Sequence, residues 1–422
     1  NLFMNGLVFT IIIFSIFVIG TGYFFWQNLR GIWPAIKTPP EDIAETINTT
    51  GMPLKLPPGF LIEIFAQDLP GARVMKFDQF GNMWVSQTRE GMVTLLEIQD
   101  GKVTGQSPIL KNLDKPHGLL FGAGERFSAL YIAEENKIIV LPTYSDGEPQ
   151  KVIDLPSGGN HYTRTLEWLP GKENEKMLAS VGSTCNVCFE EDEHRAAISL
   201  FDLETKKLEL FARGLRNSVF MTAHPVTGKI WATEMGRDLL GDDIPPDEIN
   251  VIEPDKNYGW PTCYGKNVQD ADFTKTMLFK RNPCLEPYET PSHIDIPAHS
   301  APLGLAFIPE DPPSLNASGG QRGWPEEYWH DLLVAYHGSW NRSVPTGYKI
   351  VRYDLDEKGN VLGVSDFITG WLVPNGVEGL KDGEALGRPV DILVQPGGVM
   401  YISDDKAGII YRVTYEKNEA DN

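Results

Sequence analysis

A pattern of apolar runs separated by polar turns recurs along the chain from residue 74 onward. Each copy consists of an apolar run, a turn rich in Pro, Gly or Asp, and a second apolar run. The copies are VMKFDQFGNMWVSQ (74–87), GLLFGAGERFSALYIAE (118–134), TLEWLPGKENEKMLASVGS (165–183), VFMTAHPVTGKIWATEMG (219–236), LGLAFIPEDPP resuming at DLLVAYHGS after an insertion, and VDILVQPGGVMYISDD (390–405). Short runs rich in Val, Ile, Tyr and Phe between such turns predict β-strands.

A further apolar segment follows each copy and predicts one more strand. These segments are VTLLEI, KIIVLPT, ISLFDL, EINVIEP, YKIVRYDL and GIIYRVTY. A repeat of roughly 45 residues, lengthened by insertions in later copies, is typical of propeller blades. The pattern therefore predicts an all-β fold, a six-bladed β-propeller over residues 57–418. A β-sandwich also explains alternating strands, but it does not explain a repeated phrase.

A different pattern occupies the N-terminal segment. Residues 7–26 read LVFTIIIFSIFVIGTGYFFW, with no charged residue before Arg30. Twenty helical residues span roughly 30 Å, the thickness of a bilayer core, and the aromatic end resembles an interfacial belt. The segment predicts a transmembrane helix at residues 1–29 that contacts membrane lipid through residues 7–26. The Pro-rich stretch 30–56 predicts a tether.

Composition adds two constraints. The chain has 422 residues, with 41 Gly and 31 Pro, which favours turns and short strands over long helices. Its net charge of −20 makes nucleic acid an unlikely partner, because such a surface repels phosphate backbones. A basic partner or a divalent cation remains compatible with this charge.

The four cysteines are even in number and lie in the body of the chain. Cys185 and Cys188 form a CxxC motif, which alone is compatible with redox activity or half of a zinc site. No second CxxC and no nearby His pair accompany it. Structural disulfides 185–188 and 263–284, linking Cys263 to Cys284, are therefore favoured. Disulfides suit a periplasmic or extracellular compartment, although the positive charges Arg30 and Lys37 argue for the opposite orientation of the predicted anchor.

Several loop phrases resemble the glucose/sorbosone dehydrogenase family over nearly all of residues 55–415. The phrases are GNHYTRTL (159–166), VGSTCNVC (181–188), GLRN (214–217), TEMGRD (233–238), PDEIN (246–250), NYGWP (257–261), HGSWNRS (337–343) and GRPVD (387–391). Each phrase alone is weak, but their order and their positions in the blades are specific. The combination resembles the sorbosone-dehydrogenase-like branch most. This resemblance implies a dehydrogenase that oxidises sugars with pyrroloquinoline quinone (PQQ) and calcium.

The resemblance also implies roles for individual residues. His161 matches the catalytic base, and Arg216 with Asn217 matches a pair that contacts PQQ near its reactive carbonyl. Arg342 and Arg388 match basic positions that hold the cofactor's carboxylates. The carbonyl oxygens of Gly236 and Arg237 match calcium ligands, with Asp238, Asp242, Asp243, Asp247 and Glu248 as nearby acids.

One position departs from the family's pattern. Where soluble glucose dehydrogenases have a carboxylate that orients the catalytic histidine, this chain has Ser183. A serine cannot stabilise an imidazolium by charge, so either the base is weaker or another acid, Glu191 or Asp192, assists. His117, His299 and His337 are also in loops and are candidates for contacting substrate.

Three functions are compatible with these features. The leading one is a PQQ-dependent sugar dehydrogenase that faces the periplasm and passes electrons to a cytochrome or to membrane quinone. A second is a hydrolase of the lactonase type, which would hold a metal with Glu, Asn and Asp side chains. A third is a non-catalytic propeller subunit of a membrane complex, which the serine at position 183 would permit. A fold alone does not decide among them.

Overall fold

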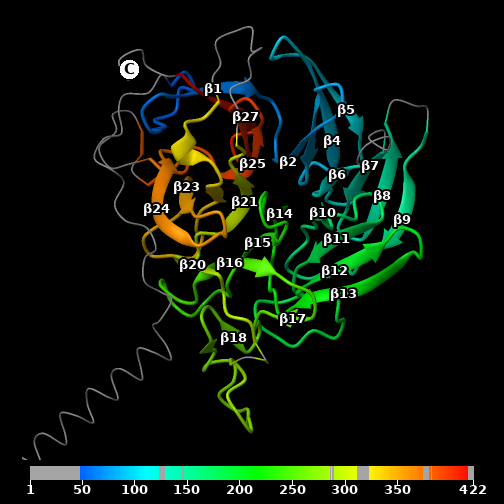
Figure 1. Ribbon diagram of the computed structural model, residues 1–422, viewed down its shortest axis with the longest axis vertical. Helices are drawn as coiled ribbons and strands as arrows, with labels where there is room; N and C mark the ends of the chain where they lie inside the picture. The colour runs from blue at the N-terminus through cyan, green and yellow to red at the C-terminus, as the bar shows by residue number, and fades with distance from the viewer. Residues whose placement is uncertain are drawn as a thin grey trace, which may run out of the picture.

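Six β-sheets arranged around a common centre, with one further two-stranded sheet, make up the described part of the protein (Figure 1). This computed structural model describes residues 48–416 except for 123–128, 144–146, 286, 288, 311–322, 374–379 and 382. Within these residues the only helix is the 3₁₀ helix η3 (Glu326–Tyr328). The six-bladed all-β propeller predicted from the repeats is therefore confirmed.

Each blade contains four antiparallel strands, one more than each repeated unit predicts. The first two blades are β2 (Ala72–Phe77), β3 (Met83–Gln87), β4 (Met92–Gln99) and β5 (Lys102–Leu110), then β6 (Leu119–Phe121), β7 (Ala129–Ala133), β8 (Lys137–Pro142) and β9 (Gln150–Asp154). The third and fourth are β10 (Leu166–Trp168), β11 (Lys176–Val181), β12 (Ala197–Asp202) and β13 (Lys207–Arg213), then β14 (Met221–Ala223), β15 (Ile230–Glu234), β16 (Asp247–Ile252) and β20 (Ile294–Ile296). The fifth is β21 (Pro302–Phe307), β22 (Leu332–Tyr336), β23 (Lys349–Leu355) and β24 (Val361–Ile368).

The sixth blade joins the two ends of the described chain. Its first three strands are β25 (Pro389–Gln395), β26 (Val399–Asp404) and β27 (Ile409–Tyr415), and its outer strand is β1 (Phe60–Ala66). Phe60 pairs with Tyr415 in antiparallel register, so the blue strand lies beside the red one in Figure 1. Because β1 precedes the first blade, this pairing closes the ring.

The inner strands hold the blades together. β2, β6, β10, β14, β21 and β25 contact one another in that order around a closed circle. The second strands β3, β15 and β22 are completely buried, because each is covered by the neighbouring blades on both faces. This explains why these segments are continuous apolar runs and do not alternate in polarity. The apolar clusters form a continuous series between adjacent sheets.

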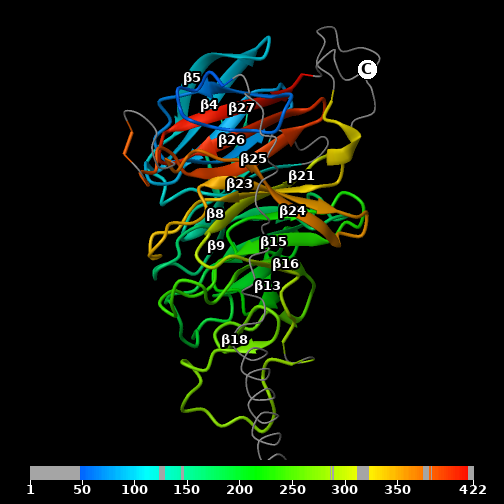
Figure 2. The same ribbon diagram turned by 90° about the vertical axis from the view of Figure 1, so that its left-hand side faces the viewer.

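An insertion interrupts the fourth blade between β16 and β20. It contains β17 (Lys256–Asn257), which pairs parallel with β13, and the hairpin of β18 (Cys263–Tyr264) and β19 (Val268–Gln269). The hairpin extends away from the ring in both views (Figures 1 and 2). The Cys263–Cys284 disulfide ties the insertion together, as predicted.

The membrane-anchored localisation predicted from the sequence is contradicted. No helix among the described residues is long and apolar enough to cross a bilayer. A helix that spans the hydrocarbon core needs about 20 residues, whereas η3 has three. The segment 7–26, on which the prediction rested, lies outside the described residues.

Candidate functional site

The loops that carry the predicted site residues meet at one end of the ring. In a four-stranded antiparallel blade, the loop after the second strand and the loop after the fourth strand emerge on the same side. His161 follows β9, Arg216 follows β13 and Arg388 follows β24, all fourth strands, whereas Ser183 and Gly236 follow second strands. Residues distant in the sequence are therefore brought to one entrance by topology alone.

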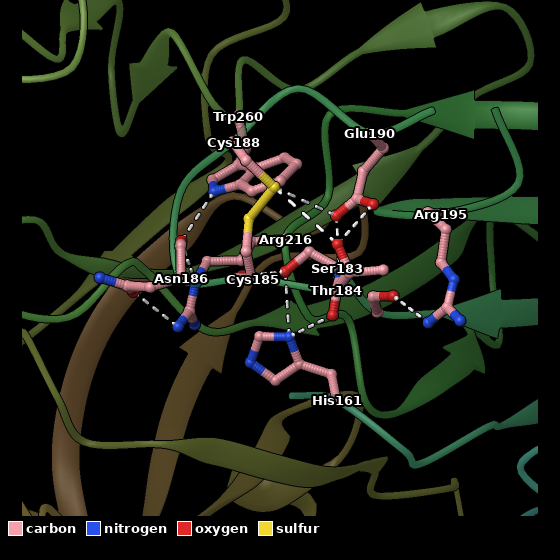
Figure 3. The surroundings of a disulfide bond; sticks show 11 residues. His161, Ser183, Thr184, Cys185, Asn186, Cys188, Glu190, Arg195, Arg216 and Trp260 are labelled. Carbon is pink, nitrogen blue, oxygen red and sulfur yellow. Dashed lines mark hydrogen bonds between the residues drawn. A yellow bond between two sulfur atoms is a disulfide. The ribbon is translucent and has the colours of Figure 1, made fainter. Parts of the chain in front are cut away.

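His161 is held by Ser183. Its Nδ1 lies 2.9 Å from the carbonyl oxygen of Ser183 and 3.0 Å from the Ser183 hydroxyl (Figure 3). The hydroxyl donates its own proton to the carbonyl oxygen of Cys185 at 2.6 Å. Since both oxygens then act as acceptors, Nδ1 carries the proton of the neutral ring. Nε2 consequently keeps its lone pair, which is the form that a general base needs.

The surroundings of His161 favour its neutral form. Burial and the guanidinium group of Arg216, followed by those of Arg164 and Arg195, lower the pKa of His161 to about 3. Glu191 and Asp192, the acids considered as substitutes for the missing carboxylate, are not among the groups that raise the pKa of His161. Glu191 and Asp192 are exposed, and Asp192 instead accepts a hydrogen bond from the backbone of His194. With Ser183 in place of a carboxylate, no negative charge at Nδ1 counteracts the fall in the pKa of His161.

Arg216 is almost completely buried, and all five of its N–H donors have acceptors. Nε donates to the Asn186 carbonyl and Nη2 to the Asn186 side-chain oxygen, both at 2.9 Å. Nη2 also donates to Asp238 at 2.8 Å. Nη1 donates to the carbonyls of Met235 at 3.4 Å and Gly236 at 2.9 Å. Arg216 therefore contributes a fixed positive charge to the site and has no donor left over in this arrangement.

Asn217 lies against His161 across Gly182. A Cβ atom at Gly182 would lie 2.6 Å from the Cβ of His161 and 2.7 Å from Oδ1 of Asn217. Only glycine permits this approach, so the position explains the glycine in the VGSTC phrase. The structure thus brings His161, Arg216 and Asn217 together, as the resemblance implies.

Arg388 belongs to a second group on the other side of the entrance. Its guanidinium donates to the carbonyl oxygens of His337 and Gly338. His337 Nε2 lies 2.9 Å from Asp405, and Arg73 forms an ion pair with the same carboxylate at 2.7 Å. Burial lowers the pKa of His337 to about 4 although Asp405 opposes this. Burial also opposes ionisation of Asp405, but His337 and Arg73 outweigh it and lower the pKa of Asp405.

His117 links the two groups near the centre of the ring. It is fully buried, and its Nδ1 lies 3.1 Å from the carbonyl oxygen of Arg164. Burial lowers its pKa, and the charges of Arg73 and Arg164 add to the effect. Nε2 of His117 and Nε of Arg73 are buried and have no hydrogen-bond partner among the described residues. Arg73 and Arg164 were not predicted as site residues: Arg73 precedes the first repeat, and Arg164 lies in the phrase GNHYTRTL without an assigned role.

The entrance is therefore cationic in a protein with a net charge of −20. Guanidinium groups act on each of three histidines, His117, His161 and His337. The buried polar atoms without partners, on Arg73 and His117, are suited to a polar ligand. These features fit a small polycarboxylate such as PQQ, which needs several cationic groups in one cavity.

One of the two carbonyl oxygens predicted to bind calcium lies beside a cationic side chain. The carbonyl oxygen of Gly236 already accepts a hydrogen bond from Arg216. A divalent cation on that oxygen would lie beside a guanidinium group, and the two positive charges would repel each other. The guanidinium group of Arg237 forms an ion pair with Asp270 at 2.8 Å, while the predicted ligand at this position is the backbone carbonyl. Calcium at the carbonyl oxygens of Gly236 and Arg237 stays a prediction from the sequence.

Two further predicted residues lie beside the site rather than in it. Arg342 donates to the carbonyl of Asp242 at 2.6 Å and forms an ion pair with Asp243 at 2.8 Å, so it fastens the loop after β15. His299 contacts the carbonyl of Gly241 in the same loop at 2.7 Å. Neither contacts His161 or Arg216 through a hydrogen bond among the described residues.

The Cys185–Cys188 disulfide, predicted from the CxxC motif, is present next to the site. It closes part of the segment that connects β11 to β12, here called the disulfide loop (residues 183–190). Figure 3 shows the disulfide between Trp260 and Glu190, with His161 and Arg216 close to the same loop. Cys188 Sγ lies 3.8 Å from Glu190, which in turn accepts a hydrogen bond from the backbone of Thr184 at 2.7 Å.

Comparison with known proteins gives a consistent result. The TrAA12-like family model matches residues 54–416. An uncharacterized protein of Borreliella burgdorferi is 33% identical over 393 residues, which cover 89% of this chain and 93% of the relative. A pyrroloquinoline quinone-dependent sugar dehydrogenase of Hypocrea jecorina is 26% identical over 248 residues, which cover 49% of this chain and 56% of the relative.

Solved structures resemble the fold. The calcium structure of the Trichoderma reesei family AA12 enzyme has a TM-score of 0.70 at 21% identity, covering 87% of this chain and 100% of that one. The holo form of the pyranose dehydrogenase PQQ domain from Coprinopsis cinerea has a TM-score of 0.67 at 19% identity, with coverages of 87% and 100%. At these identities the similarity shows a common fold.

Proposed function

This chain belongs to the TrAA12-like family, and from this membership together with the site geometry we propose that it is a PQQ-dependent sugar dehydrogenase. The observation that carries the proposal is the state of His161. Its Nδ1 proton is donated to Ser183, so the Nε2 lone pair is available, and guanidinium groups lie close to the ring. The dehydrogenase of Hypocrea jecorina supports the substrate class.

The residues of the chain have distinct roles in this proposal. PQQ, when bound, supplies the carbonyl carbon that accepts hydride from the sugar. His161 accepts the substrate's hydroxyl proton at Nε2. Arg216 holds a fixed positive charge beside the reacting atoms and stabilises negative charge that develops there. Arg388 and Arg73, on the opposite side, provide cationic partners for carboxylates.

The low pKa of His161 is part of the same proposal. A base with a pKa of about 3 takes up a proton weakly near neutral pH. Negative charge bound among the arginines offsets their repulsion and raises the pKa of His161. His161 thus becomes an effective base when the anionic ligand is in place.

Finer features stay predictions from the sequence. These are the sorbosone-dehydrogenase-like branch, the identity of the sugar, and a cytochrome or quinone as electron acceptor. Calcium at the carbonyl oxygens of Gly236 and Arg237 is a further prediction of this kind, and no step above depends on it.

The hydrolase alternative is less favoured by the geometry. Among the described residues, the only group of three or more His, Cys, Asp or Glu ligand atoms close enough to hold a metal is Cys185, Cys188 and Glu190, and its two sulfurs form a disulfide.

Titration of PQQ into the purified protein, with and without calcium, tests the proposal. We expect saturable binding and reduction of a dye by members of a panel of aldoses. His161→Ala should keep binding but lower kcat by about 10²- to 10⁴-fold, because the general base is removed.

The matched control is His330→Ala. His330 pairs with Glu310 in the loop between β21 and β22, at the opposite end of the ring, so activity should stay unchanged. Absence of PQQ binding by well-folded protein would overturn the dehydrogenase and favour the non-catalytic propeller.

A further inference from the structure

The two disulfides of the chain differ in exposure and in the loop that each closes. Cys263 and Cys284 are buried, and 21 positions separate them. Cys185 and Cys188 are half-buried, and only three positions separate them. A short loop restricts the unfolded chain less, so the Cys185–Cys188 bond contributes less to overall stability. Its greater exposure also leaves it more open to attack by an external thiol.

The disulfide loop positions His161. The Ser183 carbonyl and hydroxyl both contact Nδ1 of His161, and the hydroxyl is oriented by the carbonyl oxygen of Cys185. The neighbouring Thr184 carbonyl accepts a hydrogen bond from the backbone of Asn160. The tautomer of His161 therefore depends on where the first cysteine of the motif holds its backbone.

The same loop positions Arg216 through Asn186, the first of the two residues enclosed by the disulfide. Its carbonyl and side-chain oxygens accept two of the five Arg216 donors. The side-chain oxygen also accepts from the Asp238 backbone at 2.8 Å, and the carbonyl accepts from Trp260 at 3.3 Å (Figure 3). The disulfide loop thus holds the two Asn186 oxygens that accept hydrogen bonds from Arg216, the cation beside the predicted reaction centre.

We propose that Cys185–Cys188 is a thiol–disulfide modification site, and that its reduction disorders the disulfide loop and weakens the positioning of His161 and Arg216. The inference goes beyond the proposed function, which requires only that the loop be in place. Asn186 and Ser183 are positioning residues, since they act through Arg216 and His161.

The chemistry balances with a dithiol as the reductant. One thiolate of the dithiol attacks a sulfur of the Cys185–Cys188 bond, forming a mixed disulfide and releasing the other cysteine as a thiolate. The second thiol of the dithiol then displaces the remaining cysteine. Two electrons and two protons pass to the protein, and the dithiol becomes a cyclic disulfide. A disulfide oxidant reverses the reaction.

The test compares oxidised protein with protein treated with dithiothreitol and then alkylated. Mass spectrometry should find alkylation at Cys185 and Cys188, with Cys263 and Cys284 still joined. The imidazole signals of His161, assigned with His161→Ala, should shift or broaden on reduction and return on reoxidation. PQQ affinity should fall about tenfold, equivalent to losing one or two hydrogen bonds.

Two double variants sharpen the result. Cys185→Ser with Cys188→Ser should reproduce the reduced state and should not respond to dithiothreitol. Cys263→Ala with Cys284→Ala should keep the full response, and circular dichroism verifies that both variants are folded. The proposal is overturned if Cys185 and Cys188 resist alkylation, or if they are reduced while the His161 signals stay unchanged.

The readouts separate this inference from the proposed function. Protein that binds no PQQ in either state but shows a reversible change at His161 contradicts the dehydrogenase and retains the modification site. Protein that binds PQQ equally well in both states, with His161 unchanged, retains the dehydrogenase and loses the modification site.

Discussion

At the scale of single residues, the chemistry of the site depends on what holds His161. A carboxylate at Nδ1 would favour the imidazolium by charge, whereas Ser183 offers only hydrogen-bond acceptors. Burial and the guanidinium groups of Arg216, Arg164 and Arg195 then determine the outcome and lower the pKa of His161 to about 3. The side chain at position 183 therefore decides whether His161 is a strong base before a ligand binds.

Ser183→Asp should raise the pKa of His161 by more than about one unit, since a carboxylate within hydrogen-bond distance favours the charged ring. The measurement is an NMR titration of the His161 imidazole between pH 3 and 8. Protonation should then occur at higher pH than in the parent protein. The variant loses the donor to the Cys185 carbonyl, so folding must be verified first.

Ser183→Ala is the matched control, because the backbone carbonyl of residue 183 still accepts from Nδ1. Its His161 pKa should stay near that of the parent protein. Equal pKa values in the Asp and Ala variants would show that charge at this position does not control His161.

At the scale of elements, ring closure depends on β1. This strand belongs to no repeated phrase, yet it supplies the outer strand of the last blade. Phe60 at its start is completely buried and packs edge-on against four aromatic rings, those of Trp324, Tyr328, Phe367 and Tyr415. The first and last described parts of the chain are thus joined by apolar packing in addition to ladder hydrogen bonds.

Phe60→Ala should lower the free energy of unfolding by about 3–5 kcal/mol, the usual cost of removing a buried aromatic ring. Phe80→Ala is the control, because Phe80 is 62% exposed and should change stability by less than about 0.5 kcal/mol. Urea denaturation of both variants checks the prediction. Similar midpoints for the two would show that closure by β1 adds little stability.

At the scale of the whole molecule, charge is distributed unevenly. The protein carries a net charge of −20, while the entrance gathers guanidinium groups from several blades. The acidic surface acts over long range and repels an approaching anion, whereas the buried arginines act at short range. The two effects respond differently to salt, because screening reduces interactions between exposed charges most.

The association rate constant of PQQ should therefore rise by at least about twofold as salt increases from 10 to 150 mM. Over this range the Debye length falls from about 30 to about 8 Å, which screens the repulsive surface first. The dissociation rate constant should change less, because the arginines are buried or half-buried and lie at short range from the ligand. Stopped-flow fluorescence measures both, with an uncharged quinone as the control. A rate constant that falls with salt would mean that the cationic entrance dominates at long range.

The sequence by itself determined the fold class and much of the site. The repeated apolar runs predicted six blades because each blade buries the same pattern of strands, and the loop phrases placed His161, Arg216 and Asn217 together. The even number of cysteines, without a second CxxC or a nearby His pair, favoured both disulfides, and both are present. These features are encoded locally or by repetition, so they can be recognised without knowing which segments meet.

Only the tertiary structure decided the rest. It placed β1 in the last blade, and it showed that Arg73 belongs to the site, because contacts between distant segments leave no local pattern. It also showed that Arg342 binds Asp242 and Asp243, and that the Gly236 carbonyl accepts a hydrogen bond from Arg216. Whether an arginine binds a ligand or a neighbouring loop depends on which acceptors the fold brings within about 3 Å, and the sequence does not contain that distance.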